Sequence, residues 1–239
     1  MKLLTKPTGN FKTEKNIKYG YLSYILHLSP SDRSGVMNTC PKATPGCKVA
    51  CLNTTGHGGM FKPGETTNKI QDARIRRTKL FHEDKVEFFK QLISDIILAK
   101  KYTEKKRMKF SLRLNGTSDI VWEKYRMVDT GKTLFETFPD VQFYDYTKIP
   151  NRNPPSNYHL TFSRGESNQI DVLDAIEKAV NIAVVFAGKL PKIWNGWPVV
   201  SGDDNDLRFL DAPKHIIGLT AKGKAKKDTT GFVVNNTCA

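Results

Sequence analysis

Short apolar segments alternate with longer amphipathic ones along this 239-residue chain, and this alternation limits its fold more than any other feature. Enrichment in branched and aromatic residues predicts strands at 19–28, 110–114, 141–144, 158–162, 182–186, 199–200 and 216–219. Apolar residues at three- to four-residue spacing predict helices at 68–81, 83–101, 132–138 and 170–180. Strands that alternate with helices in this way predict a parallel sheet covered by helices.

The expected fold class is therefore α/β, as a single-domain TIM-like barrel that is complete, incomplete or irregular. An open doubly wound sheet is the alternative. The sequence has no internal repeat, low-complexity tract or Gly/Ser linker, so we expect one domain over residues 1–239.

Polar side chains follow five of the predicted strands at the point where each strand ends. The carboxyl ends of parallel strands are where α/β folds place their active sites, so a polar pocket is expected there. The simpler interpretation is that the same residues form turns and pair with one another as ions. The candidate catalytic residues are Asn115, Asp119, Asp145, Lys148, Arg164 and Asp203. Cations near these strand ends would suit a phosphate or carboxylate: Lys148, Arg164, Arg208 and Lys222.

Three of the four cysteines lie within twelve residues, in a segment (29–63) that has no periodicity and many Gly, Pro, Asn and Thr residues. Cys40, Cys47 and Cys51 form a C-x6-C-x3-C set, which points to a shared metal, because a disulfide would use only two thiols. Structural zinc usually uses two close pairs of ligands, whereas a loop triplet with a distant fourth thiolate suits a 4Fe–4S cluster better. Zinc and a site without metal remain the alternatives.

The fourth cysteine, Cys238, decides what such a cluster could do. We expect the tail at 232–239 to fold back so that Cys238 completes four-thiolate ligation, which would close the cluster and suit electron transfer or a structural role. Without Cys238 one iron would be open to a substrate or to S-adenosylmethionine. A free C-terminal thiol is the plainer alternative.

The chain carries 38 Lys and Arg against 24 Asp and Glu, a formal net charge of +14. Such an excess favours an anionic partner, either a small molecule or nucleic acid. If the partner is nucleic acid, the alternative function is a basic nucleic-acid-binding protein without catalysis, in which a metal only stabilises the fold. No apolar run is long enough to span a bilayer, and the N-terminus lacks the apolar region of a signal peptide. We therefore expect a cytoplasmic protein without a membrane partner; its oligomeric state is left open.

Several longer motifs resemble those of the bacteriophage "gene product 88" family, and the resemblance covers about residues 20–234. The motifs are Pro30-Ser31-Asp32-x-Ser34-Gly35, the loop from Cys40 to Gly59, Leu114-Asn115-Gly116-Thr117-Ser118-Asp119, Tyr144-Asp145-Tyr146-Thr147-Lys148, Thr161-Phe162-Ser163-Arg164, Gly202-Asp203-Asp204-x-Asp206-Leu207-Arg208-Phe209 and Gly218-Leu219-x-Ala221-Lys222-Gly223-Lys224-Ala225. The resemblance implies a phage protein acting in the host cytoplasm and implies little about mechanism.

A weaker resemblance is to radical S-adenosylmethionine enzymes, which also place a three-cysteine cluster loop after the first strand of a full or partial TIM-like barrel. Their usual spacing is C-x3-C-x2-C, from which this chain departs, and Asn115-Gly116-Thr117 is a poor substitute for their glycine-rich motif. The expected function is therefore iron–sulfur cluster binding beside a polar pocket for an anionic substrate, with redox or radical chemistry as its extension.

Overall fold

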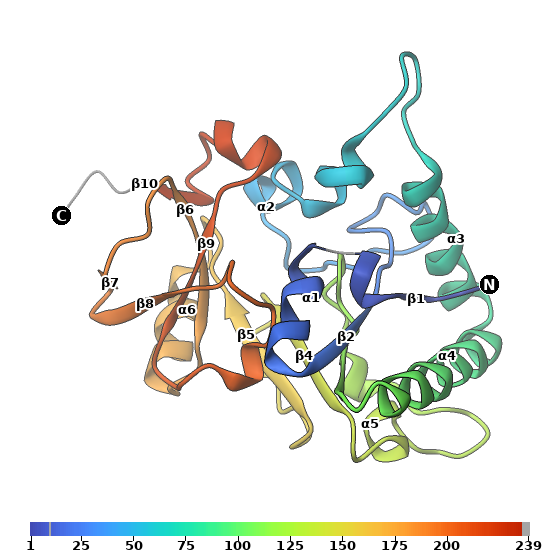
Figure 1. Ribbon diagram of the computed structural model, residues 1–239. Coiled ribbons are helices and arrows are strands. Elements are labelled where there is room, and N and C mark those ends of the chain that lie inside the picture. Colours follow the sequence, from blue (N-terminus) through green and yellow to red (C-terminus); the bar gives the residue numbers. More distant parts are fainter. Residues whose placement is uncertain (10, 236–239) are drawn as a thin grey trace.

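A single curved sheet forms the centre of the protein in this computed structural model, which describes residues 1–9 and 11–235 (Figure 1). The strand order is β1-β2-β3-β4-β5-β6-β9-β8-β7, and β10 pairs with β6. Antiparallel pairing occurs only between β1 and β2 and between β7 and β8 within the described part of the sheet. The strands are β1 (Leu4–Thr5), β2 (Tyr21–Leu26), β3 (Lys109–Arg113), β4 (Gln142–Thr147), β5 (Tyr158–Ser163), β6 (Ile182–Ala187), β7 (Ile193–Trp194), β8 (Trp197–Ser201), β9 (Ile216–Thr220) and β10 (Val233–Asn235).

The α-helices are α1 (Phe11–Lys15), α2 (Pro45–Val49), α3 (Lys69–Glu83), α4 (Lys85–Lys105), α5 (Leu134–Thr137) and α6 (Gln169–Glu177). Helices α3 to α6 pack on one face of the sheet, called the outer face here. Alternate strand residues such as Leu112, Phe143 and Phe162 point to that face and into its apolar core. Helix α1 lies on the opposite, inner face, in front of the strands in Figure 1.

The expected α/β class is confirmed, but the sheet is open and does not close into a barrel. Short antiparallel strands end it on both sides, β1 beside β2 and β7 beside β8, and β1 does not pair with β7 in the described structure. The doubly wound alternative does not describe it either, because α3 to α6 share one face and the parallel strands follow one another in nearly sequential order.

Local side-chain caps explain where the outer helices begin. Asn68 accepts hydrogen bonds from the amides of Ile70 and Gln71 at the start of α3, and Asp84 accepts from Glu87 at the start of α4. These caps satisfy amides that a helix cannot satisfy itself. Helix α5 begins with a capping box between Thr133 and Glu136.

Strand β10 fills a gap in the sheet that opens between β5 and β6. β5 pairs with β6 only at the start of β6, through Ile182 and Ala183. From Val185 onward β6 pairs instead with β10, beginning at Val233. The last described strand thus completes hydrogen bonding at the carboxyl end of β6.

Candidate functional site

The cysteine loop lies over the carboxyl ends of β3 to β6 and is fastened there by Glu166, from the loop that follows β5. The Glu166 carboxylate accepts hydrogen bonds from the Thr44 hydroxyl and from the Gly46 amide (2.6 Å), in the first turn of α2. A Cβ on Gly46 would overlap Thr230 and come within 2.7 Å of Phe232, so only glycine allows this approach. The loop therefore contacts both the β5 end and the segment that leads into β10.

The three cysteines of the loop are free thiols, and all are partly exposed. Cys40 Sγ lies 3.8 Å from the Thr117 carbonyl, in the loop that follows β3. Cys51 Sγ accepts a hydrogen bond from the Asn53 amide. Cys47 packs against a small apolar cluster that includes Phe232 and Ala225. Ala225 belongs to the 3₁₀ helix η7 (Gly223–Lys227), which lies beside α2 in Figure 1.

Burial favours the protonated form of the Cys40 and Cys51 thiols. It raises the pKa of Cys40 to about 11, although hydrogen bonds from Ser31 and Thr39 act to lower this pKa. It also raises the pKa of Cys51, although Arg74 and Arg33 act in the opposite direction. Because the thiolate is the nucleophile, these cysteines lack the activation that a catalytic cysteine shows.

The thiols are neighbours but do not converge into a ligand cage. The described residues contain no group of three or more His, Cys, Asp or Glu side chains close enough to hold a metal ion. The expected fourth ligand, Cys238, lies outside the described residues, so the expected return of the tail is described only as far as Asn235 in β10.

Two of the six candidate pocket residues form part of the scaffold. Asn115 Oδ1 accepts from the Ser118 hydroxyl, the Ile120 amide and the Trp122 indole, and its Nδ2 donates to the Ile120 carbonyl. Asp145 is fully buried; it accepts from the Asn115 amide and from the Tyr158 hydroxyl at 2.7 Å each. These contacts shape the loop after β3.

Asp119 and Lys148 lie together next to the cysteine loop. The Asp119 carboxylate accepts from the Lys148 amide (2.7 Å), while its own amide donates to the Thr39 carbonyl, directly before Cys40. The Lys148 ammonium donates to the Ser163 hydroxyl (2.7 Å). Burial raises the pKa of Asp119, and this carboxylate is among the charges acting on Cys40. The structure thus brings Asp119 close to the Cys40 thiol and Lys148 next to Asp119.

The last two candidates hold loops. Arg164 Nη1 donates to the carbonyls of Gly231 and Phe232, just before β10. Asp203 accepts from the Thr220 amide (2.9 Å) and from Lys222 Nζ (2.6 Å), on the β8–β9 side of the sheet edge. Both side chains are thus paired within the fold.

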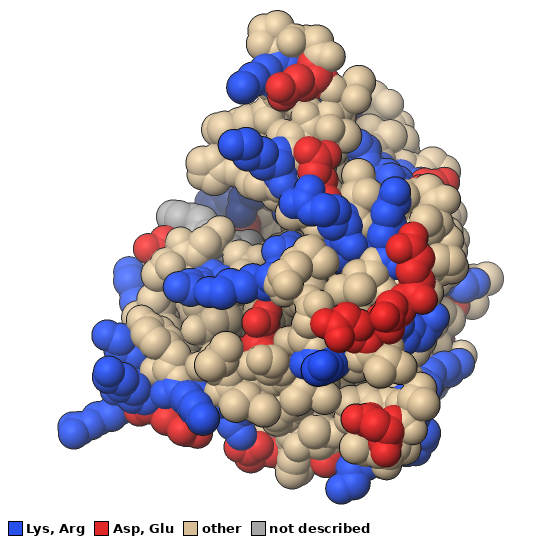
Figure 2. Space-filling view, turned by 90° about the vertical axis from the view of Figure 1, so that its right-hand side faces the viewer, with Lys and Arg blue, Asp and Glu red and all other residues tan. Residues whose placement is uncertain are grey.

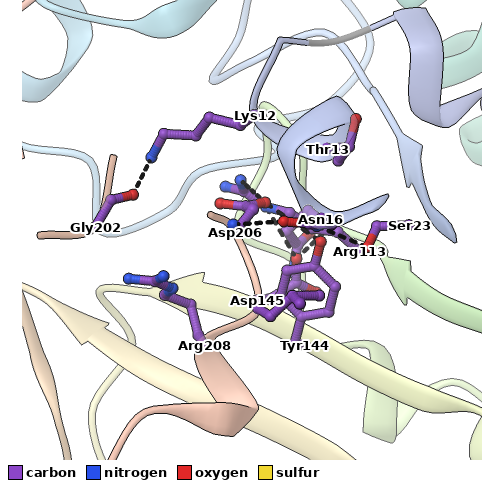
Figure 3. Close-up of polar contacts among 12 residues, drawn as sticks. Lys12, Thr13, Asn16, Ser23, Arg113, Tyr144, Asp145, Gly202, Asp206 and Arg208 are labelled. Atoms are coloured by element: carbon purple, nitrogen blue, oxygen red, sulfur yellow. Dashed lines mark hydrogen bonds and ion pairs between the residues drawn. The ribbon is translucent and has the colours of Figure 1, made fainter. Parts of the chain in front are cut away.

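The inner face carries a buried charged group that the sequence reasoning did not single out as a unit. Arg113, at the end of β3, lies 3.2 Å from the Asp206 carboxylate and 3.8 Å from that of Asp145. The Tyr144 hydroxyl also donates to Asp206, whose amide donates to Asn16 Oδ1 (Figure 3). Arg113 and Tyr144 occupy the strand positions that alternate with the apolar outer-face residues, and a polar residue at such a position was the available signal.

Lysine 12, on α1, belongs to the rim of this charged group. Its ammonium donates to the Gly202 carbonyl (2.9 Å; Figure 3) and lies 3.7 Å from the Asp203 carboxylate. Burial lowers the pKa of Lys12 to about 8, against the attraction of Asp206 and Asp203. Helix α1 therefore attaches to the loop after β8 through a lysine that loses its charge more easily than most.

The buried Asp145 gives the protein a measurable pH dependence. Burial raises its pKa from 3.8 to about 7, although Arg113 and the hydrogen bonds from Tyr158 and Asn115 oppose the change. The folded protein then holds a proton that the unfolded chain has released, so this group's contribution to stability falls as the pH rises from about 4 to about 7. We expect the unfolding free energy of wild type minus that of Asp145→Asn to decrease over this interval. Urea titrations of both proteins measure it, and a difference that is flat or increasing contradicts the expectation.

A family comparison settles the relationship suggested by the motifs. The family model described as "Gene product 88" matches residues 2–236. The chain belongs to the Gene product 88 family. No curated protein and no solved structure matches this Gene product 88 protein. The bacteriophage resemblance is thereby confirmed over almost the entire sequence.

Some of the basic side chains of this Gene product 88 protein make internal contacts. In α3, Arg74 donates to Asn53 Oδ1, and Arg77 donates to the carbonyls of Lys2 and His27. On the face that carries α3 and α4, a run of acidic side chains crosses the middle, with basic side chains both above and below it (Figure 2). None of the described helices is both long and apolar enough to cross a membrane.

Proposed function

We propose that this Gene product 88 protein binds an iron–sulfur cluster through Cys40, Cys47 and Cys51 at the carboxyl edge of its sheet. The observation that carries the proposal is the position of the thiol loop: three free cysteines are held on a short, well-fastened loop at the edge where α/β proteins keep their active sites. Soft thiolate ligands favour iron–sulfur clusters and zinc over harder oxygen-ligand metals.

The surroundings of the loop support a role for the thiols as ligands rather than nucleophiles. A metal ion would displace the protons that burial holds on Cys40 and Cys51, since ligating cysteines are thiolates. Arg33 and Arg74 act on Cys51 in the same direction as a metal, by favouring its thiolate. The loop would need to draw the three sulfur atoms closer together on binding.

The fourth ligand follows β10 in the sequence. Cys47 packs in the same apolar cluster as Phe232 and Val233, so the segment that precedes Cys238 reaches the thiol loop. With Cys238 as a ligand the cluster would be closed and suited to electron transfer. With only three thiolates, one iron would face Asp119 and Lys148, where an anionic substrate could bind.

Metal analysis of oxygen-free protein tests the proposal. We expect wild type to be brown, with broad visible absorption, an EPR signal in one redox state, and iron and acid-labile sulfide in comparable amounts. Cys40→Ala, Cys47→Ala and Cys51→Ala should each lose most of the iron, because every ligand is needed to hold the cluster. Cys238→Ala distinguishes three from four thiolates: unchanged iron content and spectrum would exclude Cys238 as a ligand.

Lys48→Ala is the matched control, because Lys48 is exposed and lies in α2 beside Cys47. It should keep its iron and its absorption spectrum. Colourless protein that contains zinc would retain the thiolate site and overturn the cluster, and protein with neither metal after reconstitution under reducing conditions would overturn both.

A further inference from the structure

Several buried polar atoms on the inner face lack a hydrogen-bond partner among the described residues; they include carboxylate oxygens of Asp206 and Asp211, and four atoms that can donate hydrogen bonds. These four are the hydroxyls of Tyr146 and Thr161, Nε2 of His159 and Nη1 of Arg208. Thr161 and Arg208 are 0% exposed. Buried polar groups of native proteins nearly always have a partner, so several such groups in one place indicate that a bound molecule or water completes them.

The register of the sheet brings these groups together. Tyr146 of β4 pairs with Thr161 of β5, and His159 lies one pleat earlier on the same face, opposite Tyr144. The 3₁₀ helix η6 (Arg208–Leu210) packs on these two strands, with the ring of Phe209 centred 5.5 Å from that of Tyr144.

Arg208 is close enough to influence both ring groups electrostatically. Burial raises the pKa of Tyr146, and Arg208 is the strongest charge opposing that rise. Burial lowers the pKa of His159, and Arg208 lowers it further. Two strands and η6 thus direct their polar side chains into one region.

The Arg208 guanidinium is positioned by its neighbours, which leave one nitrogen unused. Nη2 donates to the carbonyl (2.9 Å) and side-chain oxygen (3.0 Å) of Asn205, and Nε lies 3.3 Å from the Asp211 carboxylate. Nη1 lies near Gly202, 3.1 Å from the position that a Cβ atom on this glycine would occupy. In Figure 3 the guanidinium points away from the group formed by Asp206, Arg113 and Tyr144.

We propose that Arg208, Tyr146, Thr161 and His159 bind a tetrahedral oxoanion, as in the phosphate group of a substrate. All four can donate hydrogen bonds, and they approach from three elements, which suits an acceptor with oxygens in several directions. Guanidinium groups are preferred ligands of phosphate. Tyr146 and His159 are partly exposed as residues, but their unpartnered atoms are buried, so the bound anion would be shielded from solvent. The site goes beyond the proposed function, because it is formed by residues other than Asp119 and Lys148 and uses no cysteine.

Inorganic phosphate, titrated at constant ionic strength against chloride, tests the site by calorimetry and by thermal unfolding. Wild type should bind one phosphate saturably, with a melting temperature that rises with phosphate concentration. Thr161→Val and Tyr146→Phe should each weaken binding about tenfold or more, the expected loss for one hydrogen bond to a charged group. Both should fold without phosphate, since the deleted hydroxyls have no partner in the free protein.

Tyr158→Phe is the matched control, because Tyr158 lies in β5 on the outer face and donates to Asp145. It should lower the melting temperature without changing phosphate affinity. Cys40→Ala should keep phosphate binding even if it abolishes metal binding, so the two proposals can fail separately. Three results would overturn the oxoanion site: no saturable binding to wild type, which would leave only water in it; unchanged affinity in both Thr161→Val and Tyr146→Phe; or acetate binding as tightly as phosphate.

Discussion

Asp206→Asn should lower the free energy of unfolding by about 3–5 kcal/mol, the typical cost of removing one partner from a buried ion pair. Asp206 is fully buried and accepts from Arg113 (3.2 Å) and from the Tyr144 hydroxyl (3.3 Å). The asparagine has nearly the same shape but no charge, so the Arg113 guanidinium keeps only the more distant Asp145. Urea unfolding, followed by circular dichroism, measures the change.

The same substitution has a pH signature. Burial alone would raise the pKa of Asp206, but Arg113, Lys12 and Arg208 outweigh it and hold the pKa below the usual value. A lowered folded-state pKa gives stability that is present above the unfolded pKa and is lost as the pH falls below it. The difference in unfolding free energy between wild type and Asp206→Asn should therefore be largest near neutral pH and should decrease below about pH 4.

Asp174→Asn provides the comparison on the surface. Asp174 pairs with Lys178 one turn along α6, where both side chains are more than a third exposed. An exposed pair of this kind contributes little, and its loss should change stability by about 0.5 kcal/mol or less. An Asp206→Asn effect as small as this would contradict the role assigned to the inner-face charges.

The second large effect is expected for Asn115→Leu, at about 3–5 kcal/mol. Leucine is close to asparagine in size but cannot replace the acceptor of Ile120 and Trp122 or the donor to the Ile120 carbonyl. Each buried group left without a partner costs about 1–3 kcal/mol. The indole of Trp122 is 1% exposed, so its fluorescence reports the change directly alongside the unfolding curve.

Ser118→Ala serves as the graded control for Asn115. It removes only the hydroxyl that donates to Asn115 Oδ1, so a loss of about 1 kcal/mol is expected. If Asn115→Leu were as mild as Ser118→Ala, Asn115 would not be the scaffold residue described here, and its place in a pocket would need another explanation.

Sequence reasoning located the elements whose pattern is long or strongly apolar. Helix α4 was expected at 83–101 and spans Lys85–Lys105, because its apolar residues recur over five turns. Strands β5 and β6 were expected within one residue of their observed ends. Strand β10 and helix α1 were not predicted, since three and five residues are too short to show periodicity, and β10 exists only because β6 offers it an edge.

The candidate site was predictable only in part. The polar strand ends and the cysteine loop do meet at one edge, as Asp119 and Lys148 beside Cys40 show. The hydrogen bonds of the Asn115 side chain could not be predicted, because the sequence does not indicate that the Ile120 amide and the Trp122 indole lie against it. Lys12 was missed for a similar reason: its contact with Gly202 joins residues 190 positions apart.

The insertion of β10 between β5 and β6 makes the order of synthesis matter. All other strands emerge from the ribosome before Val233, so one edge of β6 stays unpaired at its carboxyl end until β10 is made. An unpaired strand end is a template for wrong pairing with other chains. A product truncated just before β10 would keep that open edge permanently, and would therefore be a substrate for aggregation and proteolysis although it retains nearly all of the apolar core.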